Sequence, residues 1–154
     1  MSKVTVVLTS CNRSKELKVT LQSFFKFNTY PIKKIIIIDD SSKKGCIDEA
    51  IKVIPNNIEK QIIYNEQNIG QIKSIDKAYS LVETEYIFHC EDDWEFYDYG
   101  FIEKSMNILN KNKNLYCVWL RPYKHFRVIN NGHPVEPGII DNYRLMGVFK
   151  ERTN

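Results

Sequence analysis

The sequence predicts an α/β fold in which a mostly parallel central sheet is flanked by helices. Short β-branched runs alternate with longer segments of helical spacing, which is the pattern of βαβ units. The run Lys34 to Asp39 is apolar enough to be covered on both faces, as central parallel strands are. The length of 154 residues suits a single core, so we expect one domain over residues 1–154 with a change of pattern near residue 120.

Hydrophobic spacing places the individual elements. Strands are expected over residues 4–9, 34–39, 61–64, 86–90 and 115–120, and helices follow near residues 48–53, 70–82 and 100–110. The first helix begins after Asn12 or Ser14, either of which can cap it, and its buried stripe is Leu17, Leu21, Phe24 and Phe25. The inner face of the helix over 70–82 is expected to carry Ile72, Ile75, Ala78, Tyr79 and Val82. Beyond Arg121, prolines and glycines indicate hairpin or loop structure.

Composition excludes several classes of protein. No apolar run approaches the roughly 18 residues of a membrane helix, and the run Val4 to Leu8 is too short for a signal peptide, so we expect a cytoplasmic protein. The net charge is only +3 and the lysines are spread along the chain, which does not predict nucleic-acid binding. The four cysteines are widely separated and form no CxxC pair, so neither a zinc site nor a disulfide framework is indicated.

Polar clusters follow each of the first four expected strands. In an open parallel sheet, ligands bind at the carboxyl ends of the strands, where loops and helix N-termini converge. The clusters therefore predict one binding site at that edge of the sheet. They are Thr9 to Arg13, Asp39 to Ser42, Asn65 to Gly70 and Glu91 to Trp94.

The acidic triplet Glu91, Asp92 and Asp93 is the strongest of these signals. Three adjacent carboxylates repel one another, so they indicate either a bound cation or a solvated turn. Mg²⁺ or Mn²⁺ takes one or two carboxylates and completes its shell with water and phosphate oxygens, which suits a nucleoside diphosphate. The pair Asp39 and Asp40 is also open to two interpretations, since one aspartate can cap a turn while the other accepts hydrogen bonds from a base or ribose.

Four ordered motifs together carry a family resemblance that spans about residues 3–120. They are Val4 to Arg13, Ile37 to Ser42, Asn68 to Gly70 and Tyr86 to Asp93. With them the sequence resembles the family 2 glycosyltransferases, which are inverting enzymes of Rossmann-like GT-A fold. The resemblance implies that residues 1–120 bind a nucleotide sugar and that residues 121–154 form a short or truncated acceptor-side segment.

The resemblance also implies roles for single residues. Thr9 and Asp40 would contact the nucleobase, usually uracil, and Lys73 is the nearest basic candidate for a contact to the donor. Asp93 would ligate the metal, with Glu91 in the place of the first acid and Asp92 near the ribose or a metal-bound water. Ser10 and Cys11 stand where many relatives have an aromatic residue, which leaves the identity of the base open. The expected nucleotide-binding set is Thr9, Ser10, Asn12, Arg13, Asp39, Asp40, Asn68, Gly70, Lys73 and Asp92.

The expected activity is transfer of a sugar from a nucleotide sugar, most simply a UDP-sugar, to a hydroxyl of a saccharide or glycan acceptor, with Mn²⁺ or Mg²⁺. An inverting transfer needs a general base, and the late carboxylates Glu136, Asp141 and Glu151 carry no context that marks one. The alternative is a catalytically silent nucleotide-sugar module completed by a partner chain or a homo-oligomer. A nucleotidyltransferase is disfavoured because Thr9 to Arg13 contains no glycine for a phosphate loop.

Overall fold

A computed structural model of the chain describes residues 4–120, 139–140 and 143–144. The chain divides into two compact units, Met1–Lys104 and Ser105–Asn154. The first unit holds the four-stranded sheet and the polar clusters. Within the described ranges, no helix is both long and apolar enough to span a membrane. That residues 1–154 fold as one domain stays a prediction.

The sheet has the strand order β3-β2-β1-β4 and every neighbouring pair is parallel. Its strands are β1 (Val4–Ser10), β2 (Lys34–Asp39), β3 (Glu59–Tyr64) and β4 (Tyr86–Glu91). The predicted α/β class and the first four predicted strands are therefore confirmed, with small differences at the strand ends. Beyond Arg121 the described residues form a short antiparallel pair, β5 (Ile139–Ile140) with β6 (Tyr143–Arg144), in keeping with the predicted hairpin.

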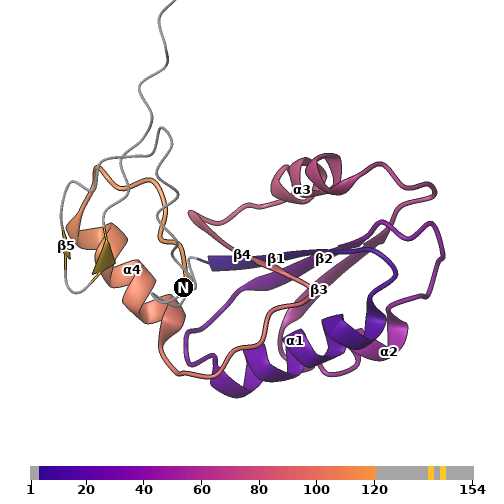
Figure 1. The fold of residues 1–154 in the computed structure, drawn as a ribbon, viewed down its shortest axis with the longest axis horizontal. Coiled ribbons are helices and arrows are strands. Elements are labelled where there is room, and N and C mark those ends of the chain that lie inside the picture. The colour runs from indigo at the N-terminus through magenta and orange to yellow at the C-terminus, as the bar shows by residue number, and fades with distance from the viewer. Residues whose placement is uncertain (1–3, 121–138, 141–142, 145–154) are drawn as a thin grey trace, which may run out of the picture. The chain divides into compact units, whose positions relative to one another are not determined.

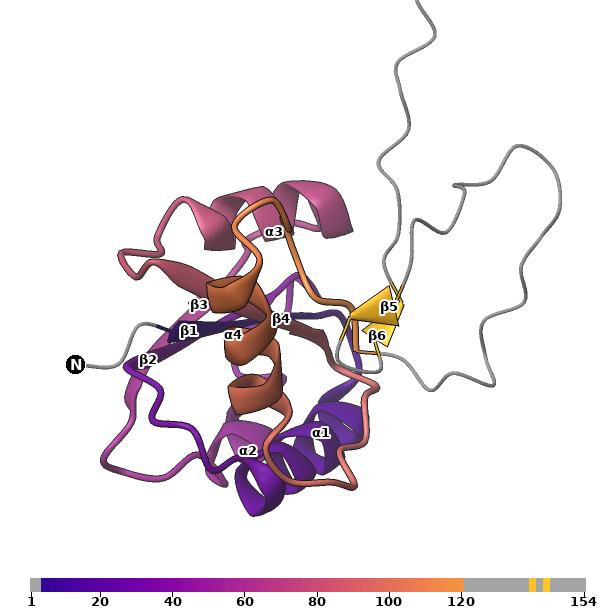
Figure 2. The same ribbon diagram turned by 90° about the vertical axis from the view of Figure 1, so that its left-hand side faces the viewer.

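Helices cover both faces of the sheet, as Figures 1 and 2 show. Helices α1 (Ser14–Phe27) and α2 (Asp48–Ile51) lie on one face, and α3 (Gln71–Tyr79) lies on the other. The fourth helix, α4, spans Phe101–Lys111. Each of these helices was expected from its spacing.

The two central strands are buried because they are covered from both sides. Ile35, Ile36, Ile37 and Ile38 of β2 are all 0% exposed. Successive side chains of a strand point to opposite faces, and Ile36 and Ile38 pack with Val7 of β1 and Ala78 of α3. The alternate residues Ile35 and Ile37 therefore point to the face that α1 and α2 cover.

Two details of the helices differ from expectation. The N-cap of α1 is Arg13, and no side chain caps the helix by a hydrogen bond, so the prediction of a cap at Asn12 or Ser14 is wrong. Asn12 instead takes a left-handed conformation at φ 58°, which turns the chain sharply before the helix. In α3, Ile72 and Tyr79 of the expected inner face are 76% and 39% exposed, because Ser74 and Ala78 form the buried stripe.

The expected strand over residues 115–120 is also wrong, since this segment has no strand structure. Tyr116 and Trp119 are 96% and 62% exposed, and Cys117 beside Tyr116 is exposed too. The two-residue alternation of a half-buried strand is therefore absent here. An apolar run becomes a strand only when its backbone finds a partner, which composition does not reveal.

Phe24 lies at the centre of an aromatic cluster and is only 1% exposed. The ring centroids of its neighbours lie between 5.1 and 5.7 Å away, and these neighbours are Phe25, Phe88, Phe96 and Phe101. The cluster joins α1 to β4 and to the loop that follows it. The packing of that loop, and so the position of the acidic triplet, depends on Phe24.

We expect Phe24→Ala to lower the free energy of unfolding by about 3–5 kcal/mol, because it leaves a cavity in this cluster. Val19→Ala on the same helix is the control, since Val19 is 50% exposed, and it should change stability by less than about 0.5 kcal/mol. Urea denaturation of the three proteins measures both. Equal effects of the two substitutions would show that the cluster does not stabilise the fold.

Candidate functional site

Backbone hydrogen bonds connect the carboxyl ends of β1, β2 and β3 just past the last residues of the strands. The backbone N–H of Asp40 donates to the carbonyl of Ser10 at 2.8 Å, and that of Asn65 donates to the carbonyl of Asp39 at 2.9 Å. On the other side of β1, Thr9 is in register with Glu91 of β4. The parallel sheet thus brings the four polar clusters to one edge, as expected from the sequence.

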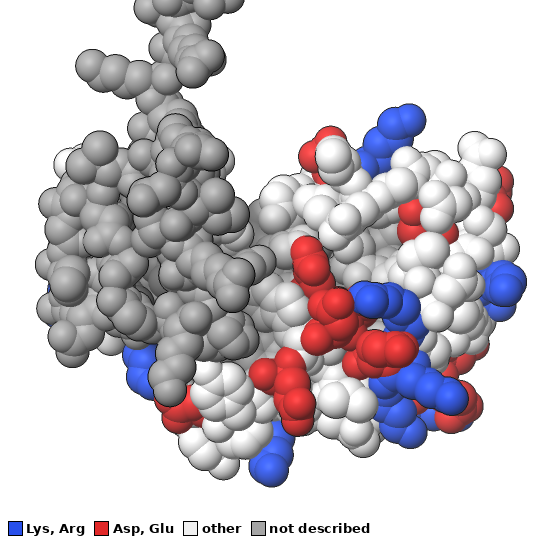
Figure 3. Space-filling view, viewed as in Figure 1, with Lys and Arg blue, Asp and Glu red and all other residues white. Residues whose placement is uncertain are grey.

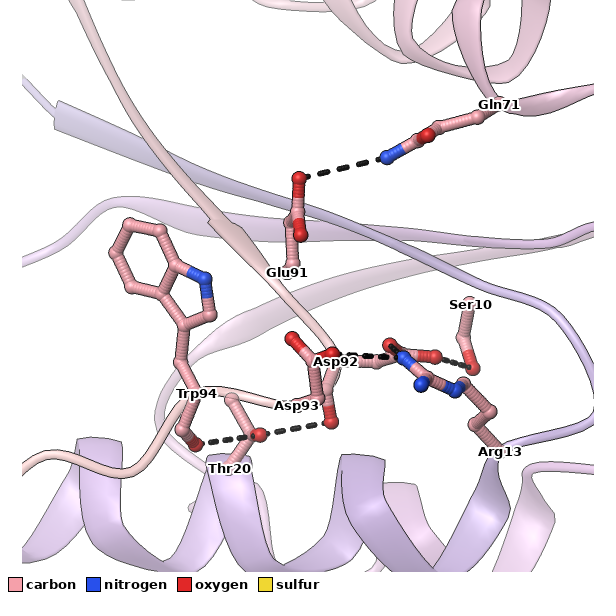
Figure 4. Close-up of polar contacts among 8 residues, drawn as sticks. All are labelled: Ser10, Arg13, Thr20, Gln71, Glu91, Asp92, Asp93 and Trp94. Atoms are coloured by element: carbon pink, nitrogen blue, oxygen red, sulfur yellow. Dashed lines mark hydrogen bonds and ion pairs between the residues drawn. The ribbon is translucent and has the colours of Figure 1, made fainter. Parts of the chain in front are cut away.

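Arg13 forms an ion pair with two carboxylates of the acidic triplet (Figure 4). Its Nη1 lies 3.1 Å from Oδ1 of Asp92 and 2.9 Å from Oδ2 of Asp93. Ser10 donates its hydroxyl hydrogen to the other oxygen of Asp92, Oδ2, at 2.7 Å. We call these four residues, Ser10, Arg13, Asp92 and Asp93, the arginine clasp.

The members of the arginine clasp differ in how firmly they are held. The side chain of Asp92 is only 7% exposed, whereas those of Arg13 and Asp93 are 49% and 43% exposed. Hydrogen bonds to Asp93 and then to Asp92, together with the charges of both, raise the pKa of the Arg13 guanidinium above its ordinary value. Arg13 is therefore a permanent cation at a half-exposed position beside the two acids.

Thr20 of α1 fixes the loop that carries the clasp. Its hydroxyl lies 2.8 Å from the carbonyl oxygen of Asp92 and 2.7 Å from that of Trp94, so its single hydrogen is shared between the two carbonyls or donated to either (Figure 4). Thr20 was not expected in the site, although a threonine beside the apolar stripe of a helix is a signal for such a bond. The Trp94 ring lies 6.1 Å from that of Phe96, which favours a role as loop anchor for Trp94.

Glu91 points away from its two acidic neighbours (Figure 4). It belongs to β4, so its side chain lies on the face opposite to that of Asp92, and it accepts a hydrogen bond from Gln71 of α3 at 3.4 Å. The structure thus does not bring the two expected metal ligands, Glu91 and Asp93, together. Across residues 4–120, no three His, Cys, Asp or Glu side chains are grouped so that they could hold a metal ion.

Asp92 and Asp93 alone still suit a hard divalent cation. Mg²⁺ and Mn²⁺ bind proteins through as few as one or two carboxylates when a phosphate supplies further oxygens. Both carboxylates already approach one cationic atom, Nη1 of Arg13, which shows that their oxygens converge. Asp93 would be the accessible ligand, since only its Oδ2 is engaged, and Arg13 occupies the place between the two acids.

Asp40 is the centre of a second set of hydrogen bonds. Its Oδ1 accepts from the Asn65 side chain at 2.8 Å and from the backbone N–H of Ile69 at 2.9 Å, and its Oδ2 accepts from the N–H of Gly70 at 2.9 Å. Burial opposes ionisation, but these bonds and one involving Ser74 outweigh it, so the pKa of Asp40 lies below its ordinary 3.8. The carboxylate therefore ties the end of β2 to the start of α3.

Asp39 has the turn-forming role that the sequence assigned to one of the two aspartates. Its carboxylate accepts from the backbone N–H of Ser41 at 3.2 Å and from the Ser41 hydroxyl at 2.7 Å.

Gly70 stands at the N-cap of α3 with φ 88°, a backbone conformation that favours glycine. No atom lies within 4 Å of a Cβ added there, so the backbone and not space requires glycine.

The other expected residues take separate positions. Thr9 is buried in β1, and the Asn68 side chain donates to the Asp40 carbonyl at 3.0 Å. Asn12 and Lys73 are exposed. The late carboxylates Glu136, Asp141 and Glu151 lie outside the described residues.

Opposite charges lie side by side on the face of the molecule in Figure 3. Acidic side chains form a group there with basic side chains directly beside them. The ion pairs of Arg13 with Asp92 and Asp93 follow the same pattern.

The sequence was compared with protein families and with solved structures. The family model of glycosyl transferase family 2 matches residues 5–152. The chain belongs to this family. The expected resemblance is therefore confirmed. A search of curated proteins gives no match.

Two solved glycosyltransferases share the fold of this family 2 chain. Residues 1–349 of S. aureus TarS in complex with UDP-GlcNAc give a TM-score of 0.60 at 17% identity, over 71% of this chain and 31% of TarS 1–349. The mannosyltransferase PcManGT from Pyrobaculum calidifontis, in complex with GDP-Man and Mn²⁺, gives 0.60 at 14% identity, over 70% of this chain and 32% of its own. The chain thus spans about a third of the length of these structures, and the predicted GT-A fold is confirmed.

We expect Asp40→Asn to lower the free energy of unfolding at pH 7 by about 1.5–3 kcal/mol, because three donors lose a charged acceptor. The pKa of Asp40 is lower in the folded chain than its ordinary 3.8, so its contribution is complete above pH 3.8 and is lost as the pH falls through the folded value. Urea denaturation at pH 7 and at a series of lower pH values measures this. The mutant and wild-type curves should converge on acidification.

Asp98→Asn is the matched control for this experiment. The Asp98 carboxylate is exposed and its Oδ2 lies 3.2 Å from Nζ of Lys104, a type of surface pair that stabilises proteins little. Its loss should change the unfolding free energy at pH 7 much less than Asp40→Asn does. If Asp40→Asn were as stable as wild type at pH 7, the carboxylate would not hold the loop.

Proposed function

We propose that this family 2 chain binds a nucleotide-sugar donor at the carboxyl edge of its sheet and transfers the sugar to an acceptor hydroxyl with the help of a divalent metal ion. The observation that carries the proposal is the convergence of Asp92 and Asp93 on one cationic centre beside the end of β1. A diphosphate with its cation needs that combination of carboxylates and a neighbouring arginine. Family membership supports the same reaction class.

The residues of the arginine clasp would act on the leaving group. Sugar transfer leaves negative charge on the departing diphosphate, and a bound Mn²⁺ or Mg²⁺ supplies a counter-charge for it. Asp93 would hold the ion, and Asp92, fixed by Ser10 at 2.7 Å, would keep the second carboxylate in place. The Arg13 guanidinium is a planar donor that suits a phosphate oxygen.

The nucleoside would lie toward the ends of β1 and β2. We propose uridine as the base, on the ground of the family resemblance of Thr9 and Asp40. Three of about four acceptor positions of the Asp40 carboxylate are already filled, so its main contribution would be to hold the loop over residues 68–70. Lys73, exposed on α3, would contact the donor. TarS was solved with UDP and PcManGT with GDP-Man, so guanosine needs to be tested beside uridine.

A catalytically silent module is the second candidate. It is favoured because the buried carboxylates Asp40 and Asp92 are engaged by donors of the chain itself, which does not suit either of them to take a proton from an acceptor hydroxyl. Such a module would bind the donor without turnover and would take its acceptor site from a partner chain or a second copy.

Calorimetric titration of UDP, GDP and ADP, with and without Mn²⁺, tests the proposal. We expect one diphosphate to bind selectively and only with Mn²⁺, and Asp93→Asn to remove that dependence on Mn²⁺. Glu91→Gln is the matched control because Glu91 points to the other face, so it should bind as wild type does. Absence of binding by all three diphosphates would contradict the donor site, and release of sugar from a donor would distinguish the enzyme from the silent module.

A further inference from the structure

Arg13 holds the same two carboxylates that the proposed metal ion would need. We propose that the divalent cation and Arg13 exchange places: the cation displaces the guanidinium from Asp92 and Asp93, and Arg13 then turns to the diphosphate of the donor. This inference rests on the proposed function and adds to it a residue that couples metal binding to nucleotide binding. It follows from four features of the arginine clasp.

The first feature is that the two acids share one nitrogen of the guanidinium. Asp92 Oδ1 and Asp93 Oδ2 lie 3.1 and 2.9 Å from the same Nη1 atom. A divalent ion between these oxygens would stand within a few ångströms of a permanent positive charge. Because like charges at such distances repel strongly when water is partly excluded, the ion and this position of Arg13 exclude each other.

The second feature is that Asp92 is held by other parts of the chain while the arginine is not. Asp92 is buried and accepts the Ser10 hydroxyl at 2.7 Å, and its backbone carbonyl lies 2.8 Å from the Thr20 hydroxyl. Removal of Arg13 therefore leaves Asp92 in position.

The third feature is the freedom of Arg13 to leave. Its side chain is 49% exposed, and within residues 4–120 its ion pairs and hydrogen bonds are those to Asp92 and Asp93. The pair between Arg13 and Asp93 is exposed on both sides and therefore weak, and Asp92 keeps the hydrogen bond from Ser10 when a divalent ion replaces the guanidinium. Its backbone stays in place as the N-cap of α1, which keeps the guanidinium beside the site after it has left the acids.

The fourth feature is the charge of the partner that Arg13 would gain. A diphosphate offers the guanidinium phosphate oxygens that it binds as well as carboxylates. Mn²⁺ alone must displace Arg13 without giving it a new partner, whereas Mn²⁺ with a nucleotide diphosphate gives it one. Metal and nucleotide should therefore raise each other's affinity, and by linkage the two effects are equal in size.

The test is titration of MnCl₂ into the nucleotide-free chain, with free Mn²⁺ followed by electron paramagnetic resonance. We expect Arg13→Gln to tighten Mn²⁺ binding by about two- to fivefold, the range expected when one weak competing ion pair is removed. Lys15→Gln is the matched control, since it removes the same charge from the same helical turn and Lys15 is exposed without contact to the acids. Its effect should be less than about twofold, because a solvated charge at that distance is screened.

The second arm repeats the Mn²⁺ titration in the presence of UDP and of GDP. The diphosphate should raise Mn²⁺ affinity more in the wild type than in Arg13→Gln, because only the wild type gains the new arginine contact. Thermal melting of the variants confirms that each is folded. Arg13→Lys keeps the charge without the planar guanidinium and should lie between the two.

Three results would overturn the exchange. The first is that Arg13→Gln leaves Mn²⁺ affinity unchanged or weakens it. The second is that Lys15→Gln tightens Mn²⁺ binding as much as Arg13→Gln does. The third is that nucleotide binding depends on Arg13 but not on Mn²⁺, since the arginine would then take the place of the metal permanently. The first arm contains no nucleotide, so it tests the exchange alone. Failure of every diphosphate to bind would count against the proposed donor site instead.

Discussion

The parallel alignment of four strands around a fully buried central pair is the constraint on which the rest of the structure depends. Parallel strands place their carboxyl ends at one edge, and the registers of Ser10 with Asp39 and of Thr9 with Glu91 fix that edge to the residue. Ser10 and Asp92 are separated by 82 positions in the sequence, yet their side chains lie 2.7 Å apart. The site is therefore a consequence of the sheet and not of any local motif.

The pleat of the sheet also decides which acids cooperate. Glu91, the last residue of β4, still follows the alternation of the strand, and its side chain lies on the side of α3. Asp92 and Asp93 both lie in the turn that follows the strand, where the alternation no longer holds, and their carboxylates come together there. A run of three carboxylates in the sequence thus becomes a pair in space, with the third turned toward α3.

The sequence predicted the sheet well because its strands have a strong and simple signal. An apolar run such as Ile35 to Ile38 is satisfied only in the centre of a covered sheet. The segment over residues 115–120 has the same signal and is not a strand, since pairing depends on a partner that lies elsewhere in the chain. Ile72 was wrongly predicted to be buried for a related reason. Which face of a short helix is buried depends on how the helix packs on the sheet, and in α3 the small residue Ala78 packs against the sheet.

The candidate site was predictable as a set of residues but not as a set of contacts. Asp40 and Asp92 are expected to bind a ligand, and in the structure their carboxylates also hold neighbouring parts of the fold. Buried carboxylates need partners within the protein, so a sequence shows that such a residue matters without showing which partner it has. The role of Thr20 in holding the loop is indicated in the sequence only by its position, as one hydroxyl on a helix face that is otherwise apolar.

The charged groups of the site are of two kinds, buried carboxylates with hydrogen-bond partners in the protein and half-exposed groups that can exchange their partner for a ligand. Removing the partner of a buried charge leaves it desolvated and uncompensated, whereas an exposed charge regains water when its partner departs. Asp39, Asp40 and Asp92 are buried and hydrogen-bonded, so they are suited to keep the edge in shape. Arg13 and Asp93 are half exposed and bind mainly each other's charge, so they are the groups that can change partners. A site that must accept and release a charged donor needs both kinds, and here they meet within one ion-paired cluster.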